Sequence, residues 1–149
     1  MGNAFQSELK RWDVIAGLLQ SNGFKHLVNV DPHDGRVANA VHQHMPELTF
    51  SFDWMSDDKE VDAMFAENTN GILDQETSDQ PDMVFIEGHD ANSVRKHIQH
   101  WFPRLKDGGV LAIGNYKHQE GIPVMRAVAD MFPLYAVNVF PDNVAVVTK

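Results

Sequence analysis

The apolar and polar positions of the chain follow two patterns in turn. Short and nearly continuous apolar runs, typical of strands buried on both faces, occupy 26–30, 48–52, 82–88 and 110–113. Apolar residues that recur every three or four positions predict helices at 7–20, 35–45, 57–69, 94–106 and 122–132. The sequence therefore predicts strands and helices in alternation, which is typical of a parallel α/β sheet.

The end of the chain departs from this alternation. Residues 134–140 and 144–148 predict two strands, and the turn between them is too short for a crossover, so they must be antiparallel. A very short strand is also expected at Ile72-Leu73. We therefore expect one domain over 1–149, with an N-terminal helix in 1–22. Residues 23–149 would form a doubly wound α/β sheet that is mostly parallel and has an antiparallel C-terminal strand.

Composition narrows the class of protein. The chain has 149 residues, of which 43% are hydrophobic and 22% charged, and its formal net charge is -9. This acidic balance argues against a protein that binds nucleic acid or an anionic membrane through a basic face. The lack of cysteine excludes disulfides, zinc–thiolate sites and thiol catalysis. Since there is no signal-peptide core and no apolar run of about 20 residues, a cytoplasmic location is expected.

The acidic residues are concentrated in one stretch. Eleven carboxylates and one lysine lie between Asp53 and Glu87. Two interpretations stay open: a solvated helix face followed by a loop, or a patch that repels anionic ligands or attracts a cationic partner.

Polar residues follow each of the predicted parallel strands. In sheets of this kind, ligands bind in the crevice outside the carboxyl ends of the strands. The candidate site therefore consists of four segments: Asp31 to Gly35, Asp53-Trp54, Glu87 to Asp90, and Gly114 to His118.

Residues 81–113 carry the most specific pattern in the chain. The sequence PDMVFIEGH at 81–89 is followed by an amphipathic helix and then by WFPRLKDGGVLAI at 101–113. This block resembles the class I S-adenosylmethionine (SAM)-dependent methyltransferases, and among them the small-molecule O-methyltransferases, whose fourth strand reads F-I-D-G with a nearby histidine. The resemblance implies a Rossmann-like fold, SAM as the cofactor and a small-molecule substrate.

The resemblance also implies which residues bind the cofactor. In the family an acid in the first strand precedes a glycine-rich turn, whereas here Asn29 replaces that acid and Asp31 replaces the first glycine. Asp31 would either obstruct the approach of the backbone to the cofactor or pair with its amino or sulfonium group. Asp53 matches the acid that contacts the ribose hydroxyls. The expected cofactor-binding residues are Asp31, His33, Gly35, Asp53, Trp54, Asp74, Glu87 and Gly88.

Two histidines that follow strand ends are candidates for a general base, because histidine titrates near neutral pH. His89 and His118, together with Asn115, are the expected catalytic residues; a role as ordinary turn residues is the alternative. Metal-dependent relatives use an acid after strand four and further oxygen ligands after strand five. Here Glu87 is the one carboxylate in these positions, and no divalent metal is expected.

The histidines and tryptophans on the predicted helices are interpreted as solvated or packing residues and not as site residues. His97 and His100 lie three positions apart on one helix, and a solvated helix surface is favoured over a metal site. Trp12 and Trp101 are interpreted as packing residues.

These residues allow three functional hypotheses to be compared. The leading hypothesis is an SAM-dependent methyltransferase that acts on an oxygen or nitrogen of a small molecule. The alternative is a methyltransferase-fold binding or regulatory protein without catalysis, which the lost glycine and the missing strand-five carboxylate favour. A nicotinamide-dependent dehydrogenase is disfavoured because no G-x-G-x-x-G follows the first strand. The short chain implies an open crevice, which a large substrate or a second subunit of a homo-oligomer would complete.

Overall fold

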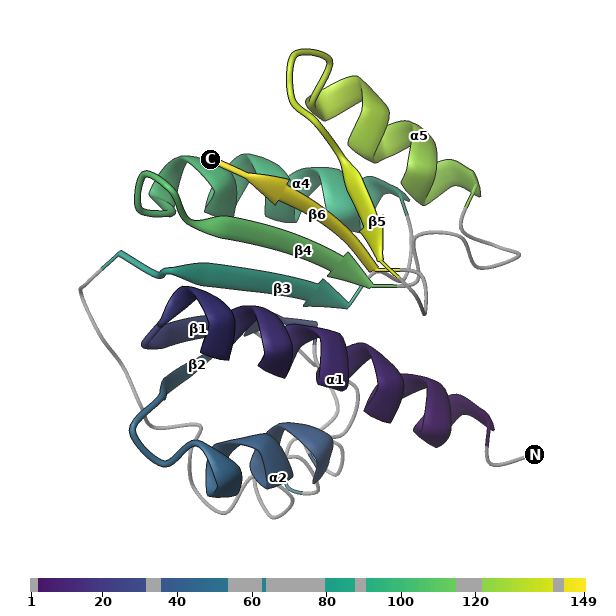
Figure 1. The fold of residues 1–149 in the computed structure, drawn as a ribbon. Helices are drawn as coiled ribbons and strands as arrows, with labels where there is room; N and C mark the ends of the chain where they lie inside the picture. Colours follow the sequence, from purple (N-terminus) through teal and green to yellow (C-terminus); the bar gives the residue numbers. More distant parts are fainter. Residues whose placement is uncertain are drawn as a thin grey trace.

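The computed structural model describes residues 3–31, 36–53, 63, 80–87, 91–114, 122–140 and 144–149. Their helices and strands alternate for most of the chain, as Figure 1 shows. In chain order they are α1 (Asn3–Asn22), β1 (His26–Val30), α2 (Arg36–His44), β2 (Thr49–Asp53), β3 (Met83–Glu87), α4 (Ala91–Trp101), the 3₁₀ turn η2 (Phe102–Arg104), β4 (Val110–Gly114), α5 (Ile122–Met131), β5 (Asn138–Phe140) and β6 (Val144–Thr148).

The strands form one six-stranded sheet in the order β2-β1-β3-β4-β6-β5. The pairs β1–β2, β1–β3 and β3–β4 are parallel, whereas β6 runs antiparallel to both of its neighbours. This confirms the predicted α/β fold with a mostly parallel sheet and an antiparallel C-terminal strand.

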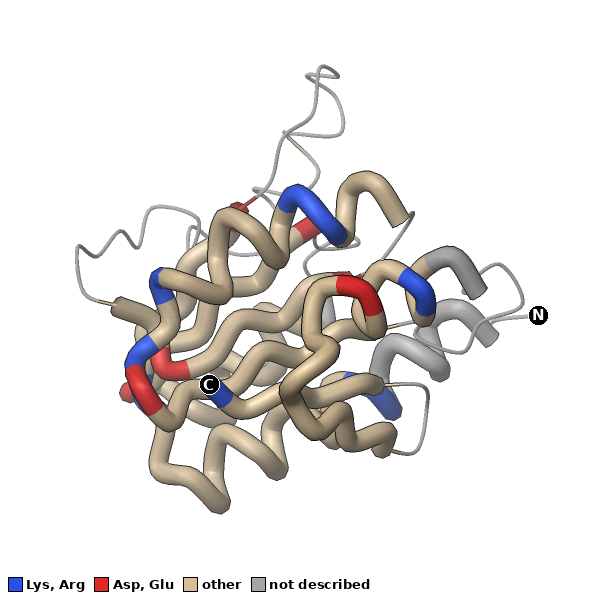
Figure 2. Tube along the Cα trace, turned by 90° about the horizontal axis from the view of Figure 1, so that it is seen from above, with Lys and Arg blue, Asp and Glu red and all other residues tan. Residues whose placement is uncertain are grey.

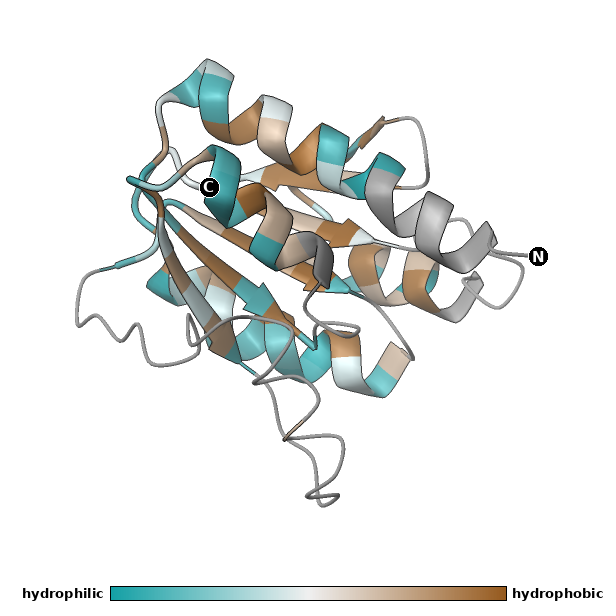
Figure 3. Cartoon of the chain, turned by 90° about the horizontal axis from the view of Figure 1, so that it is seen from below, coloured by the Kyte–Doolittle hydropathy of each residue, from teal (hydrophilic) through white to brown (hydrophobic). Residues whose placement is uncertain are grey.

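The sheet lies between two layers of helices. Alternate residues of a strand point to opposite faces, and here each face packs against its own helices. Side chains of α1 and α2 pack with one set of strand residues, and side chains of α4 and α5 with the other. The strand runs and the helix sides turned to the sheet are hydrophobic in Figure 3. Burial on both faces is the reason that the strands read as continuous apolar runs.

The predicted strand at 134–140 is only partly confirmed. Only β5, Asn138–Phe140, forms a strand. The chain first turns after α5, where the Tyr135 N–H donates to Phe132 O at 3.3 Å. The side chain of Leu134 is 94% exposed. This apolar residue therefore does not mark a buried strand. The predicted helix at 57–69 and the short strand at Ile72-Leu73 lie outside the described residues, apart from Ala63, which is helical.

Asp82 ties together the amino ends of β1 and β3. Its Oδ2 accepts hydrogen bonds from the backbone N–H groups of Lys25, at 2.7 Å, and His26, at 2.9 Å. Its Oδ1 lies 3.1 Å from the ammonium nitrogen of Lys106. Partial burial acts to raise the pKa of the Asp82 carboxyl, but the two backbone donors and Lys106 outweigh it and hold this pKa below its ordinary value of 3.8.

We predict that Asp82→Asn lowers the free energy of unfolding by about 1–2 kcal/mol at pH 7. The carboxyl binds its proton more weakly in the folded chain than in the unfolded chain. Its contribution is therefore complete above the ordinary pKa and is lost as the pH falls through the lowered one. Urea unfolding should show a smaller difference in stability between the variant and the parent at pH 3 than at pH 7.

Asp107→Asn is the matched control, because Asp107 is exposed in the turn that follows. Its effect should stay within about 0.5 kcal/mol at both pH values. An Asp82→Asn deficit of the same size at pH 7 and pH 3 would contradict the role given to the charge.

Candidate functional site

The carboxyl ends of β1, β2, β3 and β4 meet at one edge of the sheet. The chain reaches β2 on one side of β1 and β3 on the other, so the order of the strands reverses at β1. This switch point is where open α/β sheets bind ligands. Polar residues gather here on both faces of the sheet, and the two groups come from different helices and strand positions.

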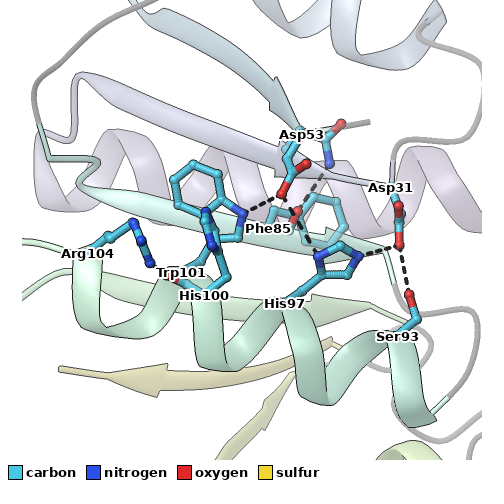
Figure 4. A network of polar contacts seen from close by, with 9 residues as sticks. Asp31, Asp53, Phe85, Ser93, His97, His100, Trp101 and Arg104 are labelled. Carbon is cyan, nitrogen blue, oxygen red and sulfur yellow. Dashed lines mark hydrogen bonds and ion pairs between the residues drawn. The ribbon is translucent and has the colours of Figure 1, made fainter. Parts of the chain in front are cut away.

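On one face, three side chains of α4 contact Asp31, which follows β1, and Asp53, which ends β2 (Figure 4). Ser93, His97 and Trp101 are spaced four residues apart, so they project from the same side of the helix. We call these three residues the α4 stripe. It is the side of α4 that passes beneath Asp31 and Asp53.

The Oδ2 atom of each acid contacts the α4 stripe. Oδ2 of Asp31 accepts from Ser93 Oγ at 3.2 Å and lies 2.9 Å from His97 Nε2. Oδ2 of Asp53 accepts from the indole N–H of Trp101 at 2.7 Å, and it lies 3.9 Å from His97 Nδ1. The imidazole ring of His97 therefore stands between two carboxylates, and all three side chains are roughly a quarter exposed.

Asp31 has a backbone conformation that ordinarily favours glycine. Its φ is 51°, in the left-handed region, and its N–H donates to Asp53 O at 3.0 Å. Asp31 is the residue that the sequence resemblance expects in place of the family's first glycine. Aspartate is one of the few other residues that tolerate this conformation, and here its carboxylate is held by Ser93 and His97.

On the α1 face, the two polar residues Asn29 and Glu87 meet across β1 and β3. The amide of Asn29 donates to Phe85 O at 3.2 Å and to Glu87 Oε2 at 3.3 Å. Asn29 is fully buried and Glu87 is 3% exposed. Glu87 is therefore an acid fixed at the carboxyl edge of the sheet, as its place at the end of the predicted strand suggested.

Arg11 of α1 adds a cation to this edge. The residue is only 8% exposed, and within the described part of the chain its Nε has no hydrogen-bond partner. A Cβ built on Gly114, the last residue of β4, would lie 3.3 Å from Arg11 Cδ and 3.2 Å from the ring of Phe85. Gly114 thus leaves the space in which the arginine stem packs.

The structure describes three of the predicted site residues: Asp31, Asp53 and Glu87. All three lie at the expected carboxyl edge, where the first two share the α4 stripe and the third contacts Asn29. The other predicted residues lie outside the described residues, and their roles stay predictions: His33, Gly35, Trp54, Asp74, Gly88, His89, Asn115 and His118.

Sequence reasoning missed the α4 stripe. His97 was expected to be solvated, but it contacts Asp31, while His100 is exposed as expected. The spacing of Ser93, His97 and Trp101 was visible, yet it indicates a shared helix side and not what that side contacts. The missing information was the position of the helix relative to β1 and β2.

Two hollows in the described part of the chain lie elsewhere, between α1 and α2. Their volumes are about 540 Å³ and 490 Å³, and both are lined by His44 and Met45. Neither is lined by Asp31, Asp53 or Glu87.

The lysines and arginines of the described part are dispersed along the chain trace (Figure 2). No described helix combines the length and the apolar character that a membrane crossing needs.

Comparison with known protein families assigns the chain to one of them. Residues 14–116, more than half of the chain, match the family described as "Methyltransferase domain". The chain therefore belongs to the methyltransferase domain family, which confirms the resemblance to methyltransferases. A comparison with curated protein sequences gives no match.

Solved structures share the fold at low sequence identity. A Staphylococcus aureus protein provisionally named a caffeoyl-CoA O-methyltransferase has a TM-score of 0.71 and 16% identity over 92% of this chain and 81% of its own. The SAH-bound methyltransferase PaMTH1 of Podospora anserina has a TM-score of 0.66 and 12% identity, covering 89% of this chain and 74% of its own. The N-methyltransferase NodS of Bradyrhizobium japonicum has a TM-score of 0.61 and 11% identity, covering 95% and 97%.

Because Asn29 donates a hydrogen bond to Glu87, we expect an acid at position 29 to lower the stability of the folded chain. Asn29→Asp keeps the shape of the side chain but replaces its two donated hydrogen bonds by a carboxylate that faces Phe85 O and Glu87. We expect a loss of about 2–4 kcal/mol in the free energy of unfolding at pH 7. Because an acid proton restores a donor, the loss should be smaller at pH 4, as chemical unfolding at both pH values would show.

Asn92→Asp is the control, since Asn92 is exposed in the first turn of α4. A carboxylate near a helix N-terminus is neutral or slightly favourable. If the two variants were equally stable at pH 7, the contact between Asn29 and Glu87 would have no energetic importance.

Proposed function

We propose that this protein binds SAM at the carboxyl edge of β1, β2 and β3 and transfers its methyl group to an oxygen or nitrogen of a small molecule. The family match over residues 14–116 carries the proposal. The fold supports it, because Asp31, which follows β1, and Asp53, which ends β2, lie at the switch point of the sheet. Structural neighbours include both O- and N-methyltransferases by name.

The side chains at this edge suit the cofactor chemically. Among the described residues, the Oδ1 atom of Asp53 is left without a hydrogen bond, because the contacts to Trp101 and His97 use Oδ2. A carboxylate oxygen that only accepts is suited to the hydroxyls of a ribose. Asp31 and Asp53 together supply negative charge, which favours a ligand with a sulfonium and an ammonium group.

When bound, SAM supplies an electrophilic methyl group that passes in line to the acceptor. The work of the chain is then to align the acceptor with that methyl group and to accept at most one proton. His89 or His118 would take this proton. Arg11, a buried cation beside Gly114, is available to an anionic group of the acceptor.

Calorimetric titration with SAM tests the proposal directly. We predict that the parent binds SAM and that Asp53→Asn weakens binding by about 1–3 kcal/mol, since the ribose hydroxyls lose a charged acceptor. The variant also alters the partner of Trp101, so Trp101→Phe is measured beside it. A larger loss in Asp53→Asn than in Trp101→Phe assigns the effect to the cofactor.

Asp107→Asn serves again as the remote control, because Asp107 is exposed in the turn before β4. It should bind SAM as the parent does. Absence of SAM binding in the parent would refute the proposed function and leave the fold alone.

Asp31 separates the proposed enzyme from a non-catalytic relative. If its carboxylate attracts the cationic cofactor, Asp31→Gly should weaken SAM binding by about 1–2 kcal/mol, although glycine fits the left-handed backbone. If the carboxylate instead blocks a lost site, the same substitution should strengthen or create binding. One titration therefore gives opposite signs for the two functions.

A further inference from the structure

The α4 stripe places one titratable ring between the two acids of the candidate cofactor site. His97 Nε2 lies 2.9 Å from Asp31 Oδ2, and Nδ1 lies 3.9 Å from Asp53 Oδ2. A carboxylate can only accept, so the hydrogen bond to Asp31 requires a proton on Nε2. The neutral ring meets this requirement, and a second proton on Nδ1 would face Asp53.

Among the residues that the structure describes, Asp31 and Asp53 are the charged partners of His97. On the same face of the sheet, His26 of β1 bonds Ser51 Oγ at 3.0 Å. From α5, Asp130 pairs with Arg95 of α4 at 3.0 Å on an exposed side of the helix. The other charged or titratable residues that the structure describes on α4, η2 and α5 are exposed: Lys96, His100, Arg104 and Arg126.

We propose that His97 is a positioning residue that holds Asp31 and Asp53 together, and that its charge sets how strongly the site prefers SAM over S-adenosylhomocysteine (SAH). This inference rests on the proposed function. SAM carries a sulfonium charge that the thioether SAH lacks. With His97 neutral, two carboxylates face the site and favour the cation. With His97 protonated, one of those negative charges is offset and the preference falls.

The expected size follows from the interaction of unit charges near a partly exposed site. One charge added beside the two acids should change the ratio of the SAH and SAM dissociation constants by about three- to tenfold. The preference for SAM should therefore decrease as the solution becomes acidic and the ring gains its second proton.

The first experiment measures Kd for SAM and for SAH by calorimetry from pH 8 to pH 5.5. The parent should lose about three- to tenfold of its preference for SAM, whereas His97→Gln, which cannot be charged, should keep a constant ratio. The matched control is His44→Gln, because His44 is exposed on α2, and it should follow the parent. A ratio that changes equally in His97→Gln and the parent, or that does not change in the parent, overturns the inference.

The second experiment needs no cofactor. The indole N–H of Trp101 donates to Asp53, so its NMR signal reports on the carboxylate that faces His97. The chain has three tryptophans, and Trp101→Phe identifies the signal. In the parent this signal should shift as the pH is lowered from 8 to 5.5; in His97→Gln it should not. Ser93→Ala, which removes one donor to Asp31 and keeps His97, should still show the shift. His97→Asn, which also cannot be charged, replaces His97→Gln if that variant fails to fold.

The two experiments distinguish the possible failures. A Trp101 signal that does not respond to pH in the parent overturns the role of His97, whatever the cofactor does. A signal that responds in a protein that binds neither SAM nor SAH refutes the proposed function and the ligand preference together.

Discussion

Helices cover both faces of β1, β3 and β4, and this burial confines polar chemistry to the ends of the strands. A charged or hydrogen-bonding side chain inside such a strand would lose water without gaining a partner. Asn29 and Glu87 are the buried polar residues at the carboxyl ends of β1 and β3, and they contact each other. The site is therefore a consequence of the same packing that stabilises the sheet.

The two helix layers give the carboxyl edge two different polar surroundings. On the α4 face, Asp31 and Asp53 contact the hydroxyl, imidazole and indole groups of the α4 stripe. On the α1 face, Glu87 receives a neutral amide from Asn29, and Arg11 brings a cation close to Gly114. This separation places two acids on one face of the candidate site and a cation on the other.

The amino ends of the strands serve stability. Asp82 joins β1, β3 and the turn after η2 through two backbone N–H groups and Lys106. These contacts lie at the edge opposite to the candidate site. The residues that join the amino ends of the strands are thus separate from those of the candidate site, so a variant at one edge leaves the contacts at the other edge in place.

The sequence by itself determined the order of elements, the parallel sheet and the antiparallel last strand, because burial on two faces and on one helix side leaves distinct apolar spacings. It also indicated Asp31, Asp53 and Glu87, since strand ends of a parallel sheet must share an edge. It did not indicate the partners of these acids. Ser93, His97 and Trp101 form a regular stripe, but a stripe of mixed polar residues has the same spacing whether it faces water or a carboxylate. The packing of α4 against the sheet decided which of these it is, because hydrogen bonds across about 50 or more residues of chain depend on the relative position of two elements and not on the local pattern of either.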